Sequence, residues 1–184
     1  MGFHHVALAT NDPDATHRFY TEVMGFELVK VVAAPTPNPG DGFSKHFFYA
    51  TGAPGESGDP GMIAFWDIHD AEIGTDFGVD LNRSAGLPWW VNHIAFDAPT
   101  RDDLDRHRRR WQEHGYKVLE VDHGFCVSIY IQDPCGNMVE FCHTTRDFTD
   151  DEKRRAIELL ADPSPELDGD YRATVHEPLQ TATA

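Results

Sequence analysis

The sequence predicts an α+β fold in which two βαβββ modules pair to form a curved mixed sheet around a cleft, followed by a C-terminal helix and an extended tail. Two observations predict it. The order strand, helix and three strands occurs twice along the chain, and the first strands of the two repeats are alike, FHHVAL at 3–8 and VNHIAF at 91–96. Because one repeat is too short to bury a large core, we expect both to share one domain.

The helix of each repeat begins at a recognisable N-terminal cap. Asp12 stands before Pro13, and proline fits the first turn of a helix because the N–H that it lacks would have no partner there. Thr100 stands three residues before Asp103, which resembles a capping box with aspartate in place of glutamate. A glycine suited to the left-handed conformation ends each helix. The expected helices cover 13–23 and 101–113, and they end before Gly25 and Gly115.

Apolar and β-branched residues after each glycine indicate three further strands in each repeat. A loop rich in glycine and proline, 51–60, makes the first repeat the longer one. The expected strands cover 26–31, 46–50 and 62–65 in the first repeat, and 116–121, 126–132 and 138–141 in the second.

These elements define the expected domain boundaries. We expect one domain over 1–145 and a C-terminal helix with an extended, loosely held tail over 146–184. The tail contains Thr149-Asp-Asp-Glu152, a capping-box pattern that predicts a helix over 150–160. Within the domain, module one covers 1–70, a polar connector covers 67–88, and module two covers 89–145.

The chain of 184 residues is acidic, with 15 basic and 31 acidic side chains and a formal charge of −16. A field of this sign repels nucleic-acid phosphates and anionic lipids, so we expect no nucleic-acid partner and no membrane association. We see no membrane span and no signal-peptide pattern, and the three cysteines have no zinc-ligand spacing. Reduced thiols are the simplest interpretation, and we therefore expect a cytoplasmic protein.

Strand alternation places three polar side chains on faces that otherwise carry small or apolar residues. His5 and His93 occupy the same place in the two repeats, and Glu140 shares a strand face with Met138 and Cys142. A buried carboxylate without a partner is costly. Two imidazoles and one carboxylate that converge in a cleft can bind a divalent metal ion and leave positions open for substrate or dioxygen. We therefore expect His5, His93 and Glu140 to be metal ligands.

Each of these residues also has a purely structural interpretation. A histidine on a strand is more often a hydrogen-bonded core residue than a ligand, and Glu140 alone could serve in a core salt bridge. His4 is expected on the opposite face of its strand from His5 and is interpreted as structural. The matching positions of the histidines in two repeats favour the metal site.

These features resemble the vicinal oxygen chelate superfamily, which includes glyoxalase I, bleomycin-resistance proteins, methylmalonyl-CoA epimerase and type I extradiol dioxygenases. The resemblance covers about 3–143 and implies that the cleft between the modules binds a metal ion. It rests on the histidine-bearing first strands, on Phe19-Tyr20 followed by Gly25-Phe26, and on Asp133-Pro134-x-Gly136-x-x-x-Glu140.

The resemblance also implies a particular set of site residues. Superfamily metal ligands come from the first and fourth strands of each half, and Ala64 stands in the first half where the second half has Glu140. A four-ligand site of the glyoxalase I kind is therefore not expected. The remaining set, His5, His93 and Glu140, resembles the extradiol dioxygenase pattern. Tyr130 is similar to the tyrosine that those dioxygenases keep near the substrate hydroxyl.

One departure from that pattern concerns the acid/base histidine. Extradiol enzymes supply it at the start of the fourth strand of the first half, where this chain reads Asp59-Pro60-Gly61. His46, on the neighbouring strand, and His123, before the third strand of the second half, are the candidates to replace it. The alternative for both is an ordinary surface or loop histidine.

The resemblance implies a non-haem, metal-dependent dioxygenase that uses Fe(II) to oxygenate or cleave a catechol-like aromatic and acts as a homodimer. Mn, Ni, Co or Zn is the alternative metal. Two other functions stay open: a metal-dependent lyase or isomerase, and a non-catalytic small-molecule binder like the bleomycin-resistance proteins. Either way the expected partner is a small aromatic or vicinal-oxygen compound. Side chains available for an apolar wall around it are Phe47, Phe65, Trp66, Trp89, Trp90 and Phe125.

Overall fold

The computed structural model describes residues 3–37, 41–52, 61–167, 169 and 171–179. Most of the loop expected at 51–60, including Asp59 and Pro60 of the expected acid/base position, lies outside these residues. The chain divides into two compact units. One consists of 1–94 with 132–139, and the other consists of 95–131 with 140–184.

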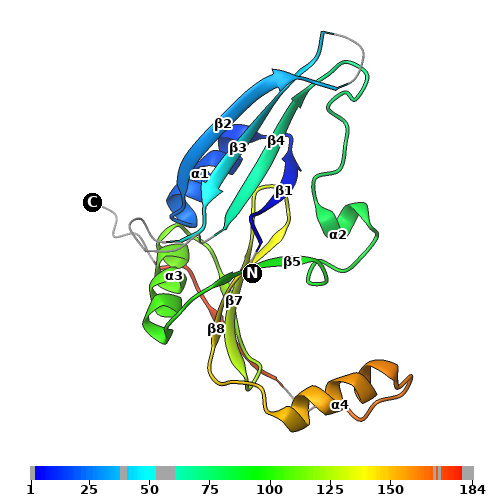
Figure 1. Ribbon diagram of the computed structural model, residues 1–184. Coiled ribbons are helices and arrows are strands. Elements are labelled where there is room, and N and C mark those ends of the chain that lie inside the picture. Colours follow the sequence, from blue (N-terminus) through cyan, green and yellow to red (C-terminus); the bar gives the residue numbers. More distant parts are fainter. Residues whose placement is uncertain (1–2, 38–40, 53–60, 168, 170, 180–184) are drawn as a thin grey trace. The chain divides into compact units, whose positions relative to one another are not determined.

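A four-stranded mixed sheet forms most of the first unit (Figure 1). Its strand order is β1-β4-β3-β2, in which β1 runs parallel to β4 and the other neighbours are antiparallel. The sequence predicted all four strands; three of them are longer than expected, and the first is shifted by two residues. Their bounds are β1 His5–Thr10, β2 Glu27–Pro35, β3 Phe43–Ala50 and β4 Met62–His69.

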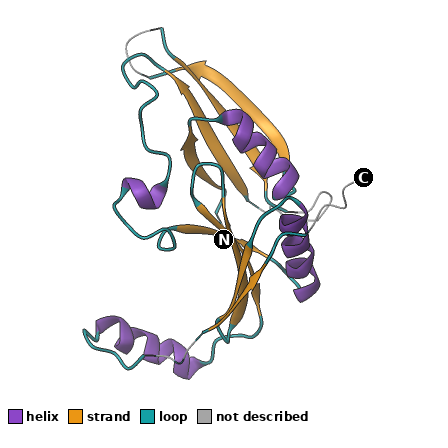
Figure 2. Cartoon of the chain, turned by 180° about the vertical axis from the view of Figure 1, so that it is seen from behind, coloured by secondary structure: helices purple, strands orange, loops and turns teal. Residues whose placement is uncertain are grey.

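The expected helix at 13–23 forms, but its second half is wider than an α-helix. Helix α1 (Pro13–Arg18) continues into a π-helical turn, η1 (Phe19–Val23), in which the N–H of Met24 donates to the Phe19 carbonyl. Figure 2 shows this helix against one face of the first sheet. Tyr20 is fully buried there and packs on Phe65 with ring centroids 4.7 Å apart.

The second unit contains a mixed sheet of five strands in the order β5-β8-β7-β6-β9. Helix α3 (Arg101–Glu113) has the predicted bounds, and the predicted capping box between Thr100 and Asp103 is present. The aromatic rings of Phe141 and Trp111 pack together between this helix and β8. The strand bounds are β5 His93–Asp97, β6 Val118–Asp122, β7 Cys126–Gln132, β8 Met138–Thr144 and β9 Arg172–His176.

The interpretation of the chain after 161 as a loosely held tail was wrong for 172–176. These residues form β9, which pairs antiparallel with β6 from Asp122↔Arg172 to Val118↔His176. A side-chain contact of 2.9 Å between His176 Nε2 and a Glu120 carboxylate oxygen reinforces the pairing. The sheet therefore gains an edge strand from a distant part of the sequence.

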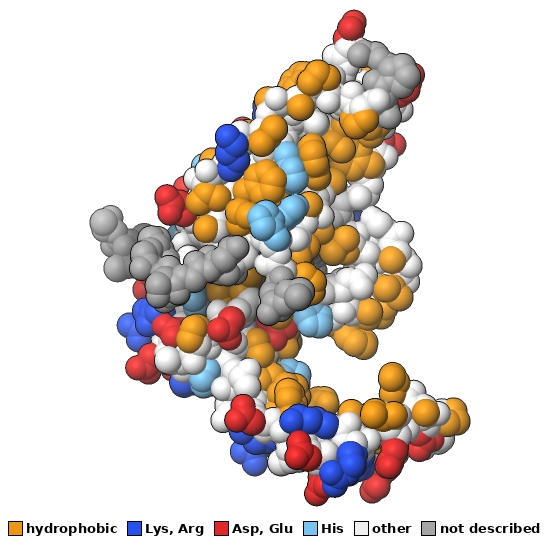
Figure 3. Space-filling model, viewed as in Figure 1, with side chains coloured by type: hydrophobic (Ala, Val, Ile, Leu, Met, Phe, Trp, Pro, Cys, Tyr) orange, Lys and Arg blue, Asp and Glu red, His pale blue; other side chains and the backbone are white. Residues whose placement is uncertain are grey.

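Two further helices lie outside the repeats. The short helix α2 (Leu81–Ser84) interrupts the connector and was not predicted, whereas α4 (Asp150–Ala161) begins at the expected capping box of Thr149 and Glu152. No residue of α4 is buried, and apolar side chains lie on its surface in Figure 3. Among the described residues, no helix is both long and apolar enough to cross a membrane.

Candidate functional site

The hairpin of β7 and β8 brings the predicted Tyr130 and Glu140 together. The backbone hydrogen bonds at the two ends of this hairpin are consistent with one continuous antiparallel register. In that register Tyr130 stands directly opposite Glu140, at a position where the two residues form no backbone hydrogen bonds with each other. Side chains approach most closely at such pairs. The bonds that define the register are those from Asp133 N–H to Asn137 O, 2.8 Å, and from Thr145 N–H to Phe125 O, 2.9 Å.

Glu140 is a buried carboxylate on the sheet face away from α3. Only 5% of its surface is exposed. The next residue, Phe141, stacks on His107 of α3 with ring centroids 3.6 Å apart, so alternation turns Glu140 to the other face, as the sequence predicted. There Glu140 is hydrogen-bonded to Tyr130. Burial raises the pKa of the Tyr130 phenol well above its usual range, and the Glu140 carboxylate raises it further, so the phenol keeps its proton.

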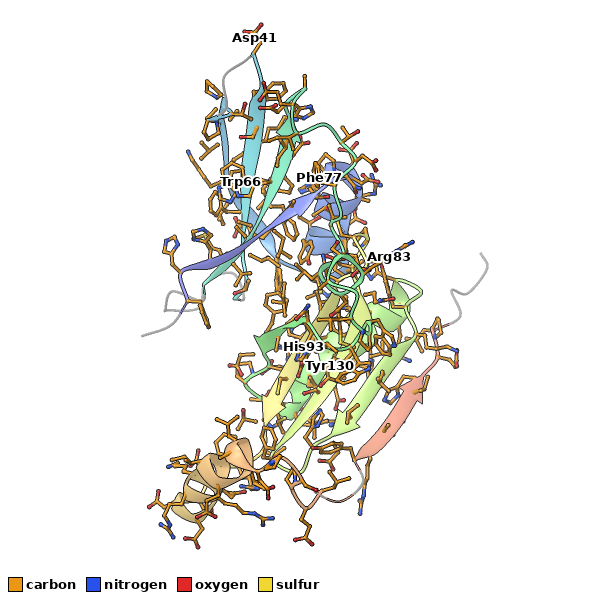
Figure 4. All side chains as sticks on the ribbon, turned by 90° about the vertical axis from the view of Figure 1, so that its right-hand side faces the viewer. Asp41, Trp66, Phe77, Arg83, His93 and Tyr130 are labelled. Atoms are coloured by element: carbon orange, nitrogen blue, oxygen red, sulfur yellow. The ribbon has the colours of Figure 1, made fainter. Side chains whose placement is uncertain are left out.

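His123 completes a chain of three polar side chains. It stands in the turn between β6 and β7, and its Nε2 lies 3.0 Å from the Tyr130 hydroxyl. Figure 4 labels Tyr130 on the second sheet. Since Tyr130 also bonds to Glu140, its hydroxyl links an imidazole to a buried carboxylate. Such a chain can move a proton between its ends with small shifts of the hydroxyl hydrogen.

Two cysteines lie beside this chain of polar groups. Cys126 and Cys142 are free cysteines whose thiols share a hydrogen bond, and the Cys126 sulfur lies 3.9 Å from the Ser128 hydroxyl. Burial, together with Cys142, raises the pKa of Cys126 to about 12. The Cys126 thiol is therefore a small, neutral neighbour of Glu140 rather than a nucleophile.

In the first unit, His5 lies in a group of histidine and aromatic rings on the exposed face of the sheet. Its ring centroid is 5.4 Å from that of Phe48 and 6.0 Å from that of His46. The expectation that His4 points to the opposite face was wrong, because the Nδ1 atoms of His4 and His5 are 2.7 Å apart. Figure 3 shows pale blue histidines among apolar atoms on this face.

His46 is partly buried between aromatic side chains. Its ring stacks on Trp66 with centroids 3.8 Å apart. Burial lowers the pKa of His46, and the neighbouring His5 lowers it further, so His46 is neutral near pH 7. Within the described part of the chain, its buried Nε2 has no hydrogen-bond partner. A neutral imidazole with an unpaired nitrogen can accept a proton.

His93 begins β5 and is exposed. Its Nδ1 lies 3.2 Å from the carbonyl oxygen of Val91, a group that can only accept a hydrogen bond. Nδ1 therefore carries the hydrogen, and the lone pair of the neutral ring is on Nε2. Metal-binding histidines commonly have their second nitrogen fixed in this way.

The three expected metal ligands have chemistry suited to a divalent ion, but they belong to different units. His5 and His93 lie in the first unit and Glu140 lies in the second. Among the described residues, no three His, Cys, Asp or Glu side chains are grouped closely enough to bind a metal ion. The three-ligand site therefore stays a prediction, whereas the contact of Glu140 with Tyr130 and His123 is a feature of the second unit alone.

The Asp133-Pro134-x-Gly136 motif has a structural role. The Asp133 carboxylate is buried and accepts hydrogen bonds from the Tyr20 hydroxyl at 3.0 Å and from the backbone N–H groups of Cys135 and Asn137. Burial raises the pKa of Asp133, and these donors oppose the shift. Gly136 has a φ of 88°, a conformation that favours glycine, so the motif fixes the turn that leads into β8.

The expected aromatic wall is only partly available to a ligand. Phe47 and Phe65 are core residues of the first unit, with 6% and 0% of their surfaces exposed. Trp66, Trp89, Trp90 and Phe125 are exposed. Phe148 and Tyr171 were not expected here, and their rings lie against those of Phe125 and His123, respectively. No local pattern could have found them, because long-range pairing of the chain brings them there.

The sequence matches the model of the Glyoxalase/Bleomycin resistance protein/Dioxygenase superfamily over residues 2–141. The chain belongs to this superfamily. Over 75 residues it is 42% identical to a Bacillus subtilis (strain 168) protein named "Putative ring-cleaving dioxygenase MhqE". That match covers 40% of this chain and 22%, or about a fifth, of the relative.

Solved structures agree with the fold. A glyoxylase/bleomycin resistance protein/dioxygenase domain from Frankia sp. EAN1pec superimposes with a TM-score of 0.53 at 19% identity, over 78% of this chain and 98% of that one. The fosfomycin resistance protein FosX from Listeria monocytogenes superimposes with a TM-score of 0.50 at 18% identity, over 83% of this chain and 98% of that one. At these identities the likeness concerns the fold alone.

Proposed function

We propose that this protein is a non-haem, metal-dependent dioxygenase that oxygenates or cleaves the ring of a catechol-like aromatic. The observation that carries the proposal is the hydrogen-bonded chain His123–Tyr130–Glu140 on one face of the second sheet. Membership of the superfamily supports it, as does the 42% identity of a segment to a relative named for ring cleavage.

The proposed metal ligands are His5, His93 and Glu140, and the proposed metal is Fe(II), with Mn, Ni, Co or Zn as the alternative. Two imidazoles and a carboxylate suit such an ion, and the Val91 carbonyl presets the ring of His93 for binding through Nε2. A metal ion bound there would act as a Lewis acid on two vicinal oxygens of the substrate and as a template for dioxygen.

The chain's own residues would handle the proton of the substrate. Tyr130 keeps its single hydroxyl proton, and a substrate oxygen would receive this hydrogen bond in place of Glu140 once the Glu140 carboxylate is bound to the metal. His123, 3.0 Å from the Tyr130 hydroxyl, is placed to receive a proton through that hydroxyl and to return it later. His46 is the second candidate for the base, because its lowered pKa keeps it neutral near pH 7.

Metal content and oxygen uptake together test the proposal. The protein should be purified without oxygen, analysed for metals, and offered a panel of catechols in an oxygen electrode. We expect bound iron, uptake of oxygen and a yellow ring-cleavage product. The same protein reloaded with zinc is the control, since zinc has no redox chemistry and should give no uptake.

Other outcomes would contradict a dioxygenase. Bound Ni, Co, Mn or Zn, with no oxygen uptake after iron loading, would favour a lyase or isomerase in which the metal stabilises an enolate. Catechol binding by a protein that takes up no metal would favour a non-catalytic binder.

A further inference from the structure

The C-terminal arm, which we define as the described residues 145–167, 169 and 171–179, is attached to the second sheet at both ends. At one end, the β6–β9 ladder pairs Asp122 with Arg172, so the same register continued by one step sets Tyr171 opposite His123. Two hydrogen bonds fix the chain beyond β9 to α3: the Gln112 side chain donates to the Glu177 carbonyl at 2.7 Å, and Leu179 N–H donates to the Gln112 carbonyl at 3.0 Å. The position of Tyr171 is thus set by backbone pairing.

The other end of the arm is fixed just before α4. The N–H of Thr145 donates to the Phe125 carbonyl at 2.9 Å, which extends the β7–β8 pairing past the end of β8. Phe148 directly precedes Thr149, whose side chain closes the capping box of α4 with Glu152. The backbone on both sides of Phe148 is therefore ordered by hydrogen bonds.

These attachments build a continuous series of rings, which we call the aromatic row: Tyr171, Phe125 and Phe148, joined through His123. The Tyr171 ring meets His123 edge-on at 5.0 Å, the His123 and Phe125 centroids are 6.3 Å apart, and those of Phe125 and Phe148 are 5.1 Å apart. The exposed fractions are 59% for Tyr171, 51% for Phe148 and 36% for Phe125. Three large apolar rings therefore face solvent beside the His123–Tyr130 pair, and contiguous exposure of this kind marks a binding surface.

We infer that the aromatic row is a substrate-binding surface, on which the C-terminal arm selects flat aromatic compounds and presents them to Tyr130 and His123. The inference rests on the proposed function and goes beyond it, because Phe148 and Tyr171 lie outside the residues matched by the superfamily model, 2–141. Aromatic rings pack favourably on one another in offset or edge-to-face arrangements, which a saturated ring of the same size cannot match. Selectivity for aromatic over saturated vicinal diols follows.

Binding of two matched diols tests this inference. The probes are naphthalene-2,3-diol and cis-1,2-cyclohexanediol, titrated calorimetrically into the iron-loaded protein under nitrogen. We expect wild type to prefer the aromatic diol, and Tyr171→Leu and Phe148→Leu each to raise its Kd about three- to tenfold, the effect of losing one aromatic pair. The Kd of the saturated diol should change less than twofold by the same reasoning.

Two control variants separate binding from folding. Tyr171→Phe keeps the ring and should bind like wild type, and Leu167→Ala removes another exposed apolar side chain of the arm, 86% exposed, without touching the row. Equal melting temperatures for all variants exclude unfolding. An unchanged Kd in both leucine variants would overturn the inference, as would equal affinity of wild type for the two diols. A wild type that prefers the aromatic diol but consumes no oxygen would overturn the proposed dioxygenase while leaving the aromatic row in place.

Discussion

The two sheets carry different side chains at equivalent positions of their paired strands. In the first unit, Phe48 of β3 stands opposite Ala64 of β4. In the second unit, the corresponding positions on β7 and β8 hold Tyr130 and Glu140, which form a hydrogen bond. Topology and strand pairing are shared, so the difference in chemistry comes from two side chains. The comparison indicates that equivalent strand positions hold an apolar pair in the first unit and a phenol beside a carboxylate in the second.

The units also differ at their sheet edges. In the first sheet, β2 is the outermost strand, and it exposes Val29, Val31 and Val32. In the second sheet, β9 covers the corresponding edge of β6, and Tyr171, which directly precedes β9, lies beside His123. The added strand thus occurs in the unit that carries the reactive pair.

Replacement of Glu140 by alanine gives the second unit the residue that the first unit has at this position, and it should have the largest effect. Because Glu140→Ala removes a proposed ligand, we expect metal affinity to fall by at least about a hundredfold. Turnover should be lost. Metal-free wild type and variant should melt alike, since bound metal stabilises only by mass action. Glu113→Ala, an exposed carboxylate of α3, is the control. A variant that fails to fold would mean that Glu140 is structural first.

Replacement of Tyr130, which stands opposite Glu140, tests the second member of the pair that distinguishes the two units. Tyr130→Phe removes one hydroxyl and keeps the ring, so we expect turnover to fall roughly ten- to a thousandfold, the scale of one lost transition-state hydrogen bond. Metal affinity should fall by about tenfold or less, because Tyr130 is not a proposed ligand and affects the metal only through its hydrogen bond to Glu140. Steady-state kinetics and metal titration measure the two effects separately. Wild-type turnover in this variant would remove Tyr130 from the mechanism.

The second unit should also be the more sensitive to acid. His107 of α3 stacks on Phe141, and burial lowers its pKa to about 4, with Arg110 and Arg106 adding to the shift. The unfolded chain, with a histidine pKa near 6.5, binds this proton more readily, so stability present above about pH 6.5 is lost as the pH falls to 4. We expect a loss on the order of 3 kcal/mol across this window.

Urea unfolding at several pH values measures whether the free energy of unfolding falls as the pH falls from 6.5 to 4. His107→Phe keeps the stacked ring and removes the titration, so its stability should change much less between pH 6.5 and 4. The exposed His114, replaced by glutamine, is the control and should follow wild type. A wild type that gains stability in this window would refute the prediction.

The smallest expected effect concerns a feature that the units share. Asp12 accepts a hydrogen bond from Ala15 N–H at 2.9 Å, and Thr100 caps α3 in the same way. Asp12→Ala and Thr100→Ala should each lower the free energy of unfolding by about 1 kcal/mol. Hydrogen exchange at the first turn of each helix localises the effect. A loss of free energy of unfolding in one variant but not in the other would show that the two helix N-termini are not equivalent.

Local patterns accounted for much of the second unit. The bounds of α3 followed from Thr100 and the following glycine, and the face of Glu140 followed from strand alternation, which has a period of two residues. His123 was predicted only as one of two candidates for the base. Its 3.0 Å contact with Tyr130 depends on how the turn before β7 folds, which spacing does not determine.

Features that depend on distant pairing could not be predicted. The five residues of β9 read RATVH, too short and too polar to indicate a strand until β6 supplies its partner. The π-helical turn η1 contains buried Tyr20, whose hydroxyl donates a hydrogen bond to Asp133 far along the chain. The contact between His4 and His5 arises where β1 begins, a position at which strict alternation does not yet hold.

Strand β9 also affects the order in which the protein can fold. About fifty residues separate β6 from β9, so their pairing requires closure of a long loop and must follow the local β7–β8 hairpin. During synthesis, the chain emerges from its N-terminus, and Tyr130 and Glu140 can pair well before Tyr171 leaves the ribosome. Until then the edge of β6 stays open to other strands. We therefore expect a stage of synthesis at which Tyr130 and Glu140 are already paired and the aromatic row is not yet complete.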